Sequence, residues 1–317
     1  MLLILTDTLD KHADFVISKL SNNTKYFRLN LDVESLKNTK VTYSNNVLLI
    51  NIQSVAISTD DIQKVWCRRS FVEIPLEYDV GESVDFKIWK NEWNATLIGL
   101  YTILKNKKWL NNISDALKGE NKYYQMQLAR KVGLLMPDTI VSNQKNKLIS
   151  FMKTHNDDCV FKLINQNLYV SKDKTVQGLY TNRISTKHLK DFQEGCENPI
   201  LLQEYIEKQY EVRWTVVNGE HFVCKIDSQK SQIANEDWRR YDLAQTPHVA
   251  MKAPIEIKNI VNKLMHILKL GYGALDFIVD PSGKWYFLEI NCMGQWLWIE
   301  NLTGLKISDA IIKWIEH

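Results

Sequence analysis

The sequence predicts a mixed α/β and α+β protein with an open α/β sheet in its N-terminal region. In the first hundred residues, short β-rich runs alternate with helical stretches, which is the pattern of such a sheet. From about residue 160 the chain becomes rich in strands. With 317 residues, of which 45% are hydrophobic, the chain can bury a substantial core and divide into two or three subdomains.

The strand candidates of the N-terminal region are residues 2–5, 47–50 and 65–67. A long helix is expected at residues 84–104, because apolar side chains recur there at spacings of three or four; this face is either core or a dimer contact. Another helix is expected at residues 122–131, since Gly133 is a typical helix stop and Pro137 lies beyond it. Later helices are expected at residues 186–194, 255–270 and 307–315.

The charge of the chain is nearly balanced, with 40 basic and 37 acidic side chains. A net charge of +3 favours neither nucleic acid nor membrane as a nonspecific partner. The apolar residues 1–6 form a short run without a basic leader or cleavage site, so we interpret them as the first strand of a cytoplasmic protein. The five cysteines are scattered and contain no Cys-x-x-Cys pair, so we expect reduced structural thiols.

Two apolar strand candidates near the C-terminus carry polar side chains. A Pro-Ser-Gly-Lys segment separates them, which predicts a β-hairpin of residues 274–280 and 285–291. Alternation along each strand allows Asp276, Glu289 and Asn291 to converge. Buried carboxylates need a compensating charge, and a hard cation such as Mg²⁺ suits these oxygen atoms. The alternative is a solvent-facing hairpin with ordinary acidic residues.

A further strand candidate, residues 210–217, has one polar face. Glu211, Arg213 and Thr215 alternate with apolar residues, so they form a candidate wall of a site. Glu211 is suited to accept hydrogen bonds from ribose hydroxyls, and the peptide groups of residues 204–206 are suited to contact an adenine edge. This pattern is weak when taken alone, because exposed strand faces are often charged.

Several cationic side chains are candidates for binding phosphate. Lys162 lies inside an apolar strand and needs an anionic partner. Lys122 opens a helix, where phosphate contact and simple solvation are both reasonable. Lys225, Arg239 and Arg240 add positive charge that could surround a triphosphate. The chain has no Walker loop and no Gly-x-Gly-x-x-Gly motif, which excludes a P-loop or Rossmann nucleotide site.

The order of these features resembles the ATP-grasp superfamily over residues 116–300, in which two α+β subdomains hold ATP between them. The resemblance implies three parts. These are an N-terminal α/β domain at residues 1–115, a central subdomain at residues 116–202 and a C-terminal subdomain with the metal site at residues 203–317. One departure is that Cys292 follows Asn291 where the superfamily usually has proline.

The resemblance also implies roles for individual residues. The two phosphate-facing lysines of the superfamily match Lys122 and Lys162. The adenine hinge matches Gln203, Glu204, Tyr205 and Ile206, and the ribose ligand matches Glu211. The Mg²⁺ ligands match Asp276, Glu289 and Asn291.

Within this superfamily the chain is similar to the microviridin-type peptide maturases, also named graspetide synthetases. The similarity rests on Trp66-Cys67-Arg68-Arg69, Glu120-Asn121-Lys122, Asp237-Trp238-Arg239 and the Asn-Cys-Met-Gly-Gln-Trp run at residues 291–296. It implies an enzyme that uses ATP to join Asp or Glu side chains of a ribosomal precursor peptide to Thr or Ser hydroxyls or Lys amines. It also implies recognition of a leader segment of the precursor, and a homodimer. We expect the contacts with the leader at residues 169–183, where Lys172, Lys174 and Arg183 alternate with apolar residues.

The mechanism implied by the resemblance activates a carboxylate as an acyl phosphate. The catalytic candidates are Arg213, Arg239 and Lys225, because a guanidinium suits both a carboxylate and an acyl phosphate and Lys225 adds positive charge. Arg68 and Arg69 are candidates for the same cleft, with a structural ion pair as the alternative. Two other functions are considered: a ligase that adds glutamate to a protein tail, and a non-catalytic ATP-binding module.

Overall fold

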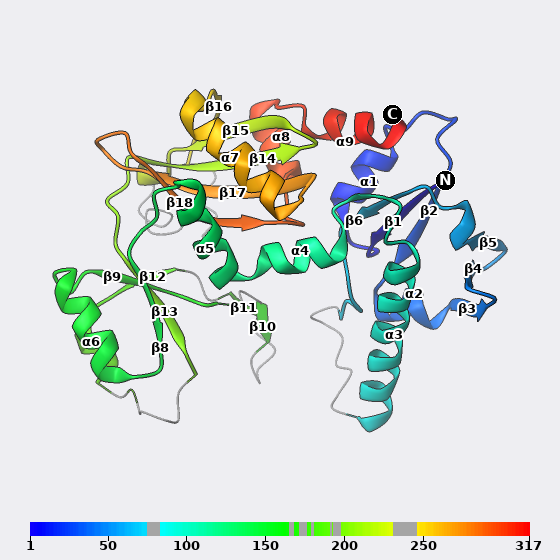
Figure 1. Cartoon of the computed structure of the whole chain (residues 1–317), viewed down its shortest axis with the longest axis horizontal. Helices are drawn as coiled ribbons and strands as arrows, with labels where there is room; N and C mark the ends of the chain where they lie inside the picture. The colour runs from blue at the N-terminus through cyan, green and yellow to red at the C-terminus, as the bar shows by residue number, and fades with distance from the viewer. Residues whose placement is uncertain are drawn as a thin grey trace.

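The computed structural model describes residues 1–74, 83–164, 181–190, 192, 198–230 and 246–317, and the backbone of residues 168–170 and 176–178. Figure 1 shows one sheet near the N-terminus, another beside α6, and a third next to the C-terminal helices. The predicted mixed α/β and α+β class is confirmed. Within the described ranges, none of the helices has both the length and the apolar character that crossing a membrane requires.

The N-terminal part is built on a parallel sheet with the strand order β2-β1-β6-β7. Its strands are β1 (Leu2–Thr6), β2 (Tyr26–Asn30), β6 (Lys64–Cys67) and β7 (Lys108–Leu110). Buried aliphatic side chains of this sheet pack against α3 (Val84–Ile103) in one core cluster. The helices α1 (Lys11–Ile17) and α2 (Val33–Lys37) start after Asp10 and Asp32, whose carboxylates accept hydrogen bonds from the first turn.

The strand predicted at residues 47–50 belongs to a separate antiparallel sheet, not to the open parallel sheet. This sheet consists of β3 (Thr39–Ser44), β4 (Val47–Ile52) and β5 (Val55–Ser58). Asn45 and Asn46 join β3 to β4 with φ values of 51° and 65°, the left-handed conformation of a two-residue hairpin turn. The short turn therefore pairs β4 with its neighbour in sequence.

The middle part contains an antiparallel sheet with the order β12-β9-β13-β8. Its strands are β8 (Thr139–Ser142), β9 (Cys159–Lys162), β12 (Asn182–Ile184) and β13 (Ile200–Glu204), and α6 (Lys145–Thr154) packs on it. The strands β10 (Leu168–Val170) and β11 (Val176–Gly178) pair with each other. The predicted boundary after residue 202 falls inside β13, and the division into three parts stays a prediction.

Two helices lead from the N-terminal part toward the site: α4 (Ile113–Glu120) and α5 (Lys122–Val132). The helix predicted at residues 122–131 is confirmed, and Gly133 ends it with a φ of 92°. Where a helix was predicted at residues 186–194, the structure has a 3₁₀ turn at Thr186–Leu189. Residues 191 and 193–197 lie outside the described ranges.

The C-terminal part contains a five-stranded antiparallel sheet with the order β16-β15-β14-β17-β18. Its strands are β14 (Tyr210–Val217), β15 (Glu220–Ile226), β16 (His248–Met251), β17 (Tyr272–Val279) and β18 (Trp285–Asn291). One core cluster joins this sheet to α5 and α7 (Ile255–Leu268). A second cluster joins the sheet to α1, α8 (Leu297–Thr303), α9 (Ile307–Glu316) and the N-terminal sheet. The N-terminal and C-terminal parts therefore share a core.

Asn111, which follows β7, links these two parts through four hydrogen bonds. Its Nδ2 donates to the carbonyls of Tyr272 and Cys292 at 2.7 and 2.8 Å. Its Oδ1 accepts from the N–H groups of Gly271 and Tyr272 at 2.7 and 2.8 Å. The residue is 1% exposed, so no solvent can replace these bonds.

We predict that Asn111→Ala lowers the midpoint of thermal unfolding strongly. Each buried backbone group that loses its partner costs about 1–3 kcal/mol, and this change affects four of them. The control is Asn112→Ala, which removes the side-chain cap of α4 and should cost about 1 kcal/mol. Equal shifts for the two variants, measured by circular dichroism, would show that Asn111 has no special structural role.

Candidate active site

Three neighbouring strands of the C-terminal sheet present a row of polar side chains. Arg213 in β14 lies opposite Asp276 in β17, which lies opposite Glu289 in β18. Asn291 lies opposite Ala274, so it projects from the same face. The structure therefore brings together the three predicted metal ligands and one predicted catalytic residue. We term Arg213, Asp276, Glu289 and Asn291 the site row.

A β-bulge places Glu289 in the site row. Asp276 pairs with Glu289 and Phe277 pairs with Phe287, so Leu288 is an extra residue in β18. Phe287 is fully buried in the core, and strict alternation would place Glu289 on that same face. Because of the extra residue, Glu289 projects from the opposite face, beside Asp276.

Each carboxylate of the site row has a cationic partner. Arg213 Nη1 lies 2.7 Å from Asp276 Oδ2, and the two side chains are only 7% and 11% exposed. Lys122 Nζ lies 2.6 Å from Glu289 Oε2. Burial opposes the charge of Arg213, but Asp276 and Glu289 nevertheless hold its pKa above its usual value.

The oxygen atoms of the site row suit Mg²⁺. The Asn291 Nδ2 atom lies 3.4 Å from Asp276 Oδ2 and 3.5 Å from Glu289 Oε1, so the three side chains converge within reach of one ion. The part of the chain that the structure describes contains no cluster of three or more His, Cys, Asp or Glu side chains suited to a metal. Two carboxylates and one amide are few ligands, which fits an ion that keeps water and phosphate oxygens.

The residues predicted to bind adenine lie at the end of β13 and are partly occupied by protein contacts. Gln203 Nε2 donates to Thr139 Oγ1 at 2.9 Å. The Glu204 carboxylate accepts from Asp138 N–H at 2.9 Å, and the Glu204 N–H donates to the Asp138 carbonyl at 3.0 Å. The Tyr205 N–H donates to a carbonyl of the same region, at residue 158. The structure therefore already engages side chains or N–H groups of Gln203, Glu204 and Tyr205 in contacts within the protein.

The predicted ribose ligand, Glu211, is buried and neutralised. Lys208 Nζ lies 2.7 Å from Glu211 Oε1, and Ser228 Oγ donates to the same oxygen at 2.9 Å. Lys208 was not among the residues predicted from the sequence. Its position three residues before Glu211 was an available signal, since the ammonium of a nearby lysine often pairs with a buried carboxylate.

The remaining predicted cations are not grouped with Arg213. Lys225 lies opposite Val212, on the other face of the sheet, where Asp227 Oδ1 is 2.8 Å from its Nζ. Lys162 is the last residue of β9, in the sheet of the middle part. Arg239, together with Asp237 and Arg240, lies outside the described residues.

Most of the region predicted to contact a leader, residues 169–183, has no described side chains. Lys172 and Lys174 lie outside the described ranges. Arg183 is described: its guanidinium pairs with Asp158 and lies 4.0 Å from the ring centre of Tyr205. Arg183 therefore packs beside the predicted adenine hinge.

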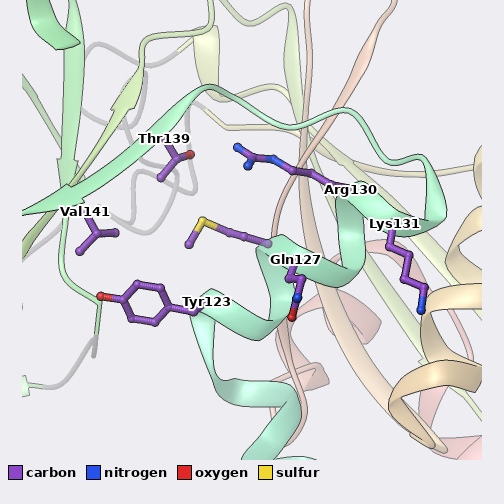
Figure 2. A pocket seen from close by; sticks show the side chains of 7 residues that line it. Tyr123, Gln127, Arg130, Lys131, Thr139 and Val141 are labelled. Atoms are coloured by element: carbon purple, nitrogen blue, oxygen red, sulfur yellow. The ribbon is translucent and has the colours of Figure 1, made fainter.

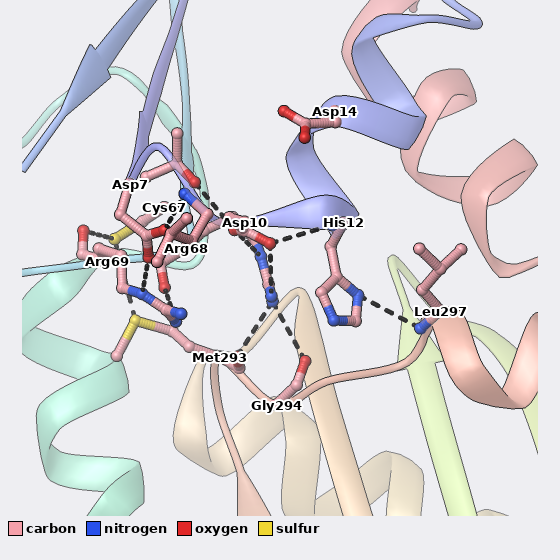
Figure 3. Close-up of polar contacts among 12 residues, drawn as sticks. Asp7, Asp10, His12, Asp14, Cys67, Arg68, Arg69, Met293, Gly294 and Leu297 are labelled. Atoms are coloured by element: carbon pink, nitrogen blue, oxygen red, sulfur yellow. Dashed lines mark hydrogen bonds and ion pairs between the residues drawn. The ribbon is translucent and has the colours of Figure 1, made fainter. Parts of the chain in front are cut away.

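The two arginines considered for the cleft, Arg68 and Arg69, form structural contacts (Figure 3). Arg68 Nε lies 3.0 Å from Asp10 Oδ2, and Arg68 Nη1 donates to the carbonyls of Met293 and Gly294. Arg69 Nε lies 2.6 Å from a carboxylate oxygen of Asp7. The alternative considered for both residues, a structural ion pair, matches this arrangement.

Two helix residues outside the predicted site also contact β18 or the segment after it. Gln125 of α5 donates to the Ile290 carbonyl and accepts from the Ile290 N–H. Glu120 of α4 accepts from the Cys292 N–H, and burial raises the pKa of Glu120. Glu120 belongs to the Glu-Asn-Lys motif noted above, which was the available signal.

A separate pocket lies between α5 and β8 (Figure 2). It has a volume of about 700 Å³ and contains no residue of the site row. Its lining combines apolar side chains with two cations: Tyr123, Met126, Gln127, Arg130, Lys131, Thr139 and Val141.

Comparison with solved structures supports the fold assignment. The macrocyclase MdnC from Microcystis aeruginosa MRC, bound with precursor peptide MdnA, is 26% identical and has a TM-score of 0.86, with 99% of both chains covered. The Chryseobacterium gregarium RiPP-associated ATP-grasp ligase, in complex with ADP and a leader and core peptide, is also 26% identical. Its TM-score is 0.80, with 99% of this chain and 96% of that chain covered.

A curated protein is also similar. The alpha-aminoadipate–LysW ligase LysX of Sulfurisphaera tokodaii is 23% identical over 248 residues, which are 74% of this chain and 81% of that protein.

Two family models match the chain in succession. The MvdD pre-ATP grasp domain matches residues 1–116, and the RimK-like ATP-grasp domain matches residues 119–315. The predicted ATP-grasp fold and the resemblance to graspetide synthetases are confirmed. Because the second model matches more than half of its residues, the chain belongs to the RimK-like ATP-grasp family, and the predicted enzyme class, an ATP-grasp ligase, is confirmed.

Proposed function

We propose that this protein is an ATP-dependent peptide macrocyclase. It joins Asp or Glu side chains of a ribosomal precursor peptide to Thr or Ser hydroxyls or Lys amines. The observation that carries the proposal is the convergence of the site row with Lys122, because it combines oxygen ligands with cations that suit phosphate and carboxylate. Support comes from the two similar structures that contain a peptide.

The proposed reaction has two steps. A peptide carboxylate oxygen bonds to the γ-phosphorus of ATP, and ADP leaves. A hydroxyl or amine of the same peptide then bonds to the acyl carbon, and phosphate leaves as the nucleophile loses its proton. No nucleophile of the protein is needed, so the protein acts by positioning and by charge neutralisation.

Asp276, Glu289 and Asn291 would hold Mg²⁺ at the phosphates. When bound, Mg²⁺ neutralises negative charge on the transferring group. Arg213 and Lys122 bind carboxylates in this structure, and either side chain can bind phosphate or the peptide carboxylate in exchange. In this exchange Mg²⁺ would pair with the carboxylates while the two cations bind the substrate groups. No buried charge would then be left unpaired, so the free-energy cost of the exchange is small.

Several finer assignments belong to the same proposal. Lys162 and Arg239 are proposed to contribute positive charge, and residues 203–206 and Glu211 to hold the nucleoside. Lys225 is left out of this proposal, because it lies on the opposite face of the sheet and pairs with Asp227. The peptide is proposed to carry a leader segment, and the protein to act in the cytoplasm.

A homodimer is also proposed. The helix α3 supports it, because one side packs into the core while three apolar side chains remain exposed: Val84 at 70%, Ile88 at 56% and Ile98 at 52%.

A second candidate is an amino-acid ligase that adds glutamate to a protein tail. It would use the same nucleotide and metal residues and differ in its substrate. The similarity to an alpha-aminoadipate–LysW ligase keeps this candidate in consideration.

We predict that Glu289→Gln lowers ATP turnover in the presence of the precursor by about 100-fold or more, since metal charge stabilisation is worth several kcal/mol. The isosteric amide keeps the shape of the side chain, so circular dichroism should still show a folded protein, although loss of the ion pair with Lys122 should lower the thermal midpoint. The control is Glu220→Gln, which neutralises an exposed partner of Lys313 far from the site row. Asp276→Ala and Asn291→Ala should also nearly abolish turnover. Normal turnover in all three site variants would disprove the metal assignment.

We predict that Lys162→Met weakens ATP binding more than it lowers stability. Methionine keeps much of the apolar stem and removes the charge that is proposed to face phosphate. Calorimetric titration with ATP and thermal unfolding measure the two effects, with Lys153→Met in α6 as a surface control. A large loss of stability with unchanged ATP binding would instead identify Lys162 as part of a structural ion pair.

We predict that the protein, supplied with ATP, Mg²⁺ and its precursor, removes one water from the peptide for each ring formed. Tandem mass spectrometry should show suppressed fragmentation between the linked residues, and hydroxylamine should open ester rings but not amides. A gain of glutamate mass without loss of water would reject macrocyclisation and favour the tail-extending ligase.

A further inference from the structure

The segment after β18, residues 292–295, is held by side chains from earlier parts of the chain; we term it the clamped loop. At its start, Asn111 Nδ2 donates to the Cys292 carbonyl at 2.8 Å, and Glu120 accepts from the Cys292 N–H. These contacts join residues separated by more than 170 positions in the sequence. The path of this segment therefore depends on parts of the chain outside its own sheet.

Arg68 holds the centre of the clamped loop. Its Nη1 donates to the carbonyls of Met293 at 3.0 Å and Gly294 at 3.1 Å, while its Nε pairs with Asp10 (Figure 3). The side chains of Arg68 and Asp10 are 3% and 1% exposed. The hydroxyl of Tyr272 donates to the same Gly294 carbonyl at 2.8 Å. Arg68 is therefore a buried link between the N-terminal part and the loop.

The clamped loop touches two members of the site row. Its last residue, Gln295, accepts a hydrogen bond from Arg213 Nη2 at 3.2 Å. A Cβ atom added to Gly294 would lie 3.0 Å from Arg213 Nη2 and 3.0 Å from the Asn291 Cβ. The loop backbone thus packs directly against Arg213 and Asn291, so any shift of the loop must move or loosen both side chains.

We propose that Arg68 is a positioning residue for the site row. By holding the Met293 and Gly294 carbonyls, it fixes the loop backbone, which in turn fixes the orientation of Arg213 and Asn291. Arg68 itself does not touch the site row in the described contacts. The effect of Arg68 on catalysis rests on the proposed function. Its direct effect is on the affinity of the site row for nucleotide together with Mg²⁺.

The geometry of a guanidinium explains why arginine stands at this position. One nitrogen of Arg68 binds the Asp10 carboxylate while another reaches two carbonyls. A lysine ammonium is a single point charge and cannot satisfy both partners in this way. Arg68→Lys therefore keeps a counter-charge for buried Asp10 but releases the clamped loop.

The test compares three variants. Arg68→Lys releases the loop, and Tyr272→Phe removes one hydroxyl that binds the same carbonyl. Arg28→Lys is the matched control: Arg28 also binds a carboxylate, at Asp14, and a backbone carbonyl, at Asp7, but contacts only the N-terminal part. Calorimetric titration with ADP, with and without Mg²⁺, is performed on all variants, and kcat and KM for ATP are measured with the precursor.

For Arg68→Lys we expect the gain in ADP affinity caused by Mg²⁺ to fall by about 10-fold, the lower range for residues that orient metal ligands. Affinity for ADP without Mg²⁺ should fall less, because the residues proposed to hold the nucleoside, 203–206 and Glu211, lie outside the clamped loop. Turnover should lose mainly kcat. Tyr272→Phe should lose affinity in the same direction but less, and Arg28→Lys should behave as the wild type.

An unchanged gain from Mg²⁺ in Arg68→Lys and Tyr272→Phe would overturn the inference. If Arg68→Lys fails to fold, Tyr272→Phe decides alone, because it removes one hydrogen bond and no charge. An equal loss in Arg28→Lys would also overturn it, since that result reflects general loosening of the N-terminal part. If the wild type binds ADP with Mg²⁺ but forms no rings, the proposed function fails while this comparison still decides the role of Arg68.

Discussion

Two carboxylates that face each other on one sheet are the constraint on which the candidate site depends. Asp276 and Glu289 are directly opposite, and like charges in that position destabilise a sheet. Arg213 offsets one charge from within the sheet, and Lys122 offsets the other from the first position of α5. The helix dipole disfavours a cation at that end of a helix, so helix stability does not account for Lys122. The ion pair with Glu289 accounts for Lys122 at this position, and it links α5 to the C-terminal sheet.

The N-terminal part contributes to the site through the backbone of the clamped loop. Its sheet shares a core with the C-terminal sheet, in which Trp66 and Trp296 are both buried. Packing brings the two parts together but does not fix their relative orientation, because apolar contacts are not directional. The hydrogen bonds of Asn111 and Arg68 fix this orientation, since each requires particular carbonyls at particular distances. The same arginine motif that resembled a signature of peptide maturases thus has a physical role in the described structure.

Local patterns predicted much of the fold and part of the site. Alternation correctly placed Glu211 and Arg213 on one face of β14, and Gly133 correctly marked the end of α5. The position of Lys225 on the other face could also have been predicted, although Lys225 was grouped with Arg213. Asn218 and Gly219 form a two-residue turn with positive φ values, which fixes the register of β14 with β15 and puts Lys225 on the face opposite Arg213. The contacts of Arg68 with Met293 and Gly294 could not be predicted from the sequence. These residues are separated from Arg68 by 225 and 226 positions, and the contacts follow no periodic pattern.

The bulge in β18 shows why even a correctly predicted hairpin does not settle its site. Phe287 and Ile290 both pack in the core, although they are three residues apart and period two allows only even spacing on one face. One extra residue must therefore lie between them, and two positions are available, Leu288 and Glu289. If Glu289 were the extra residue, its carboxylate would lose its place opposite Asp276 and its contact with Lys122. The extra residue is Leu288 because the pairing of Glu289 beside its cation and of Ile290 in the core satisfies charge and packing together. Which residue of β18 becomes the extra one depends on contacts with α5 and β17. The sequence of β18 alone therefore does not determine it.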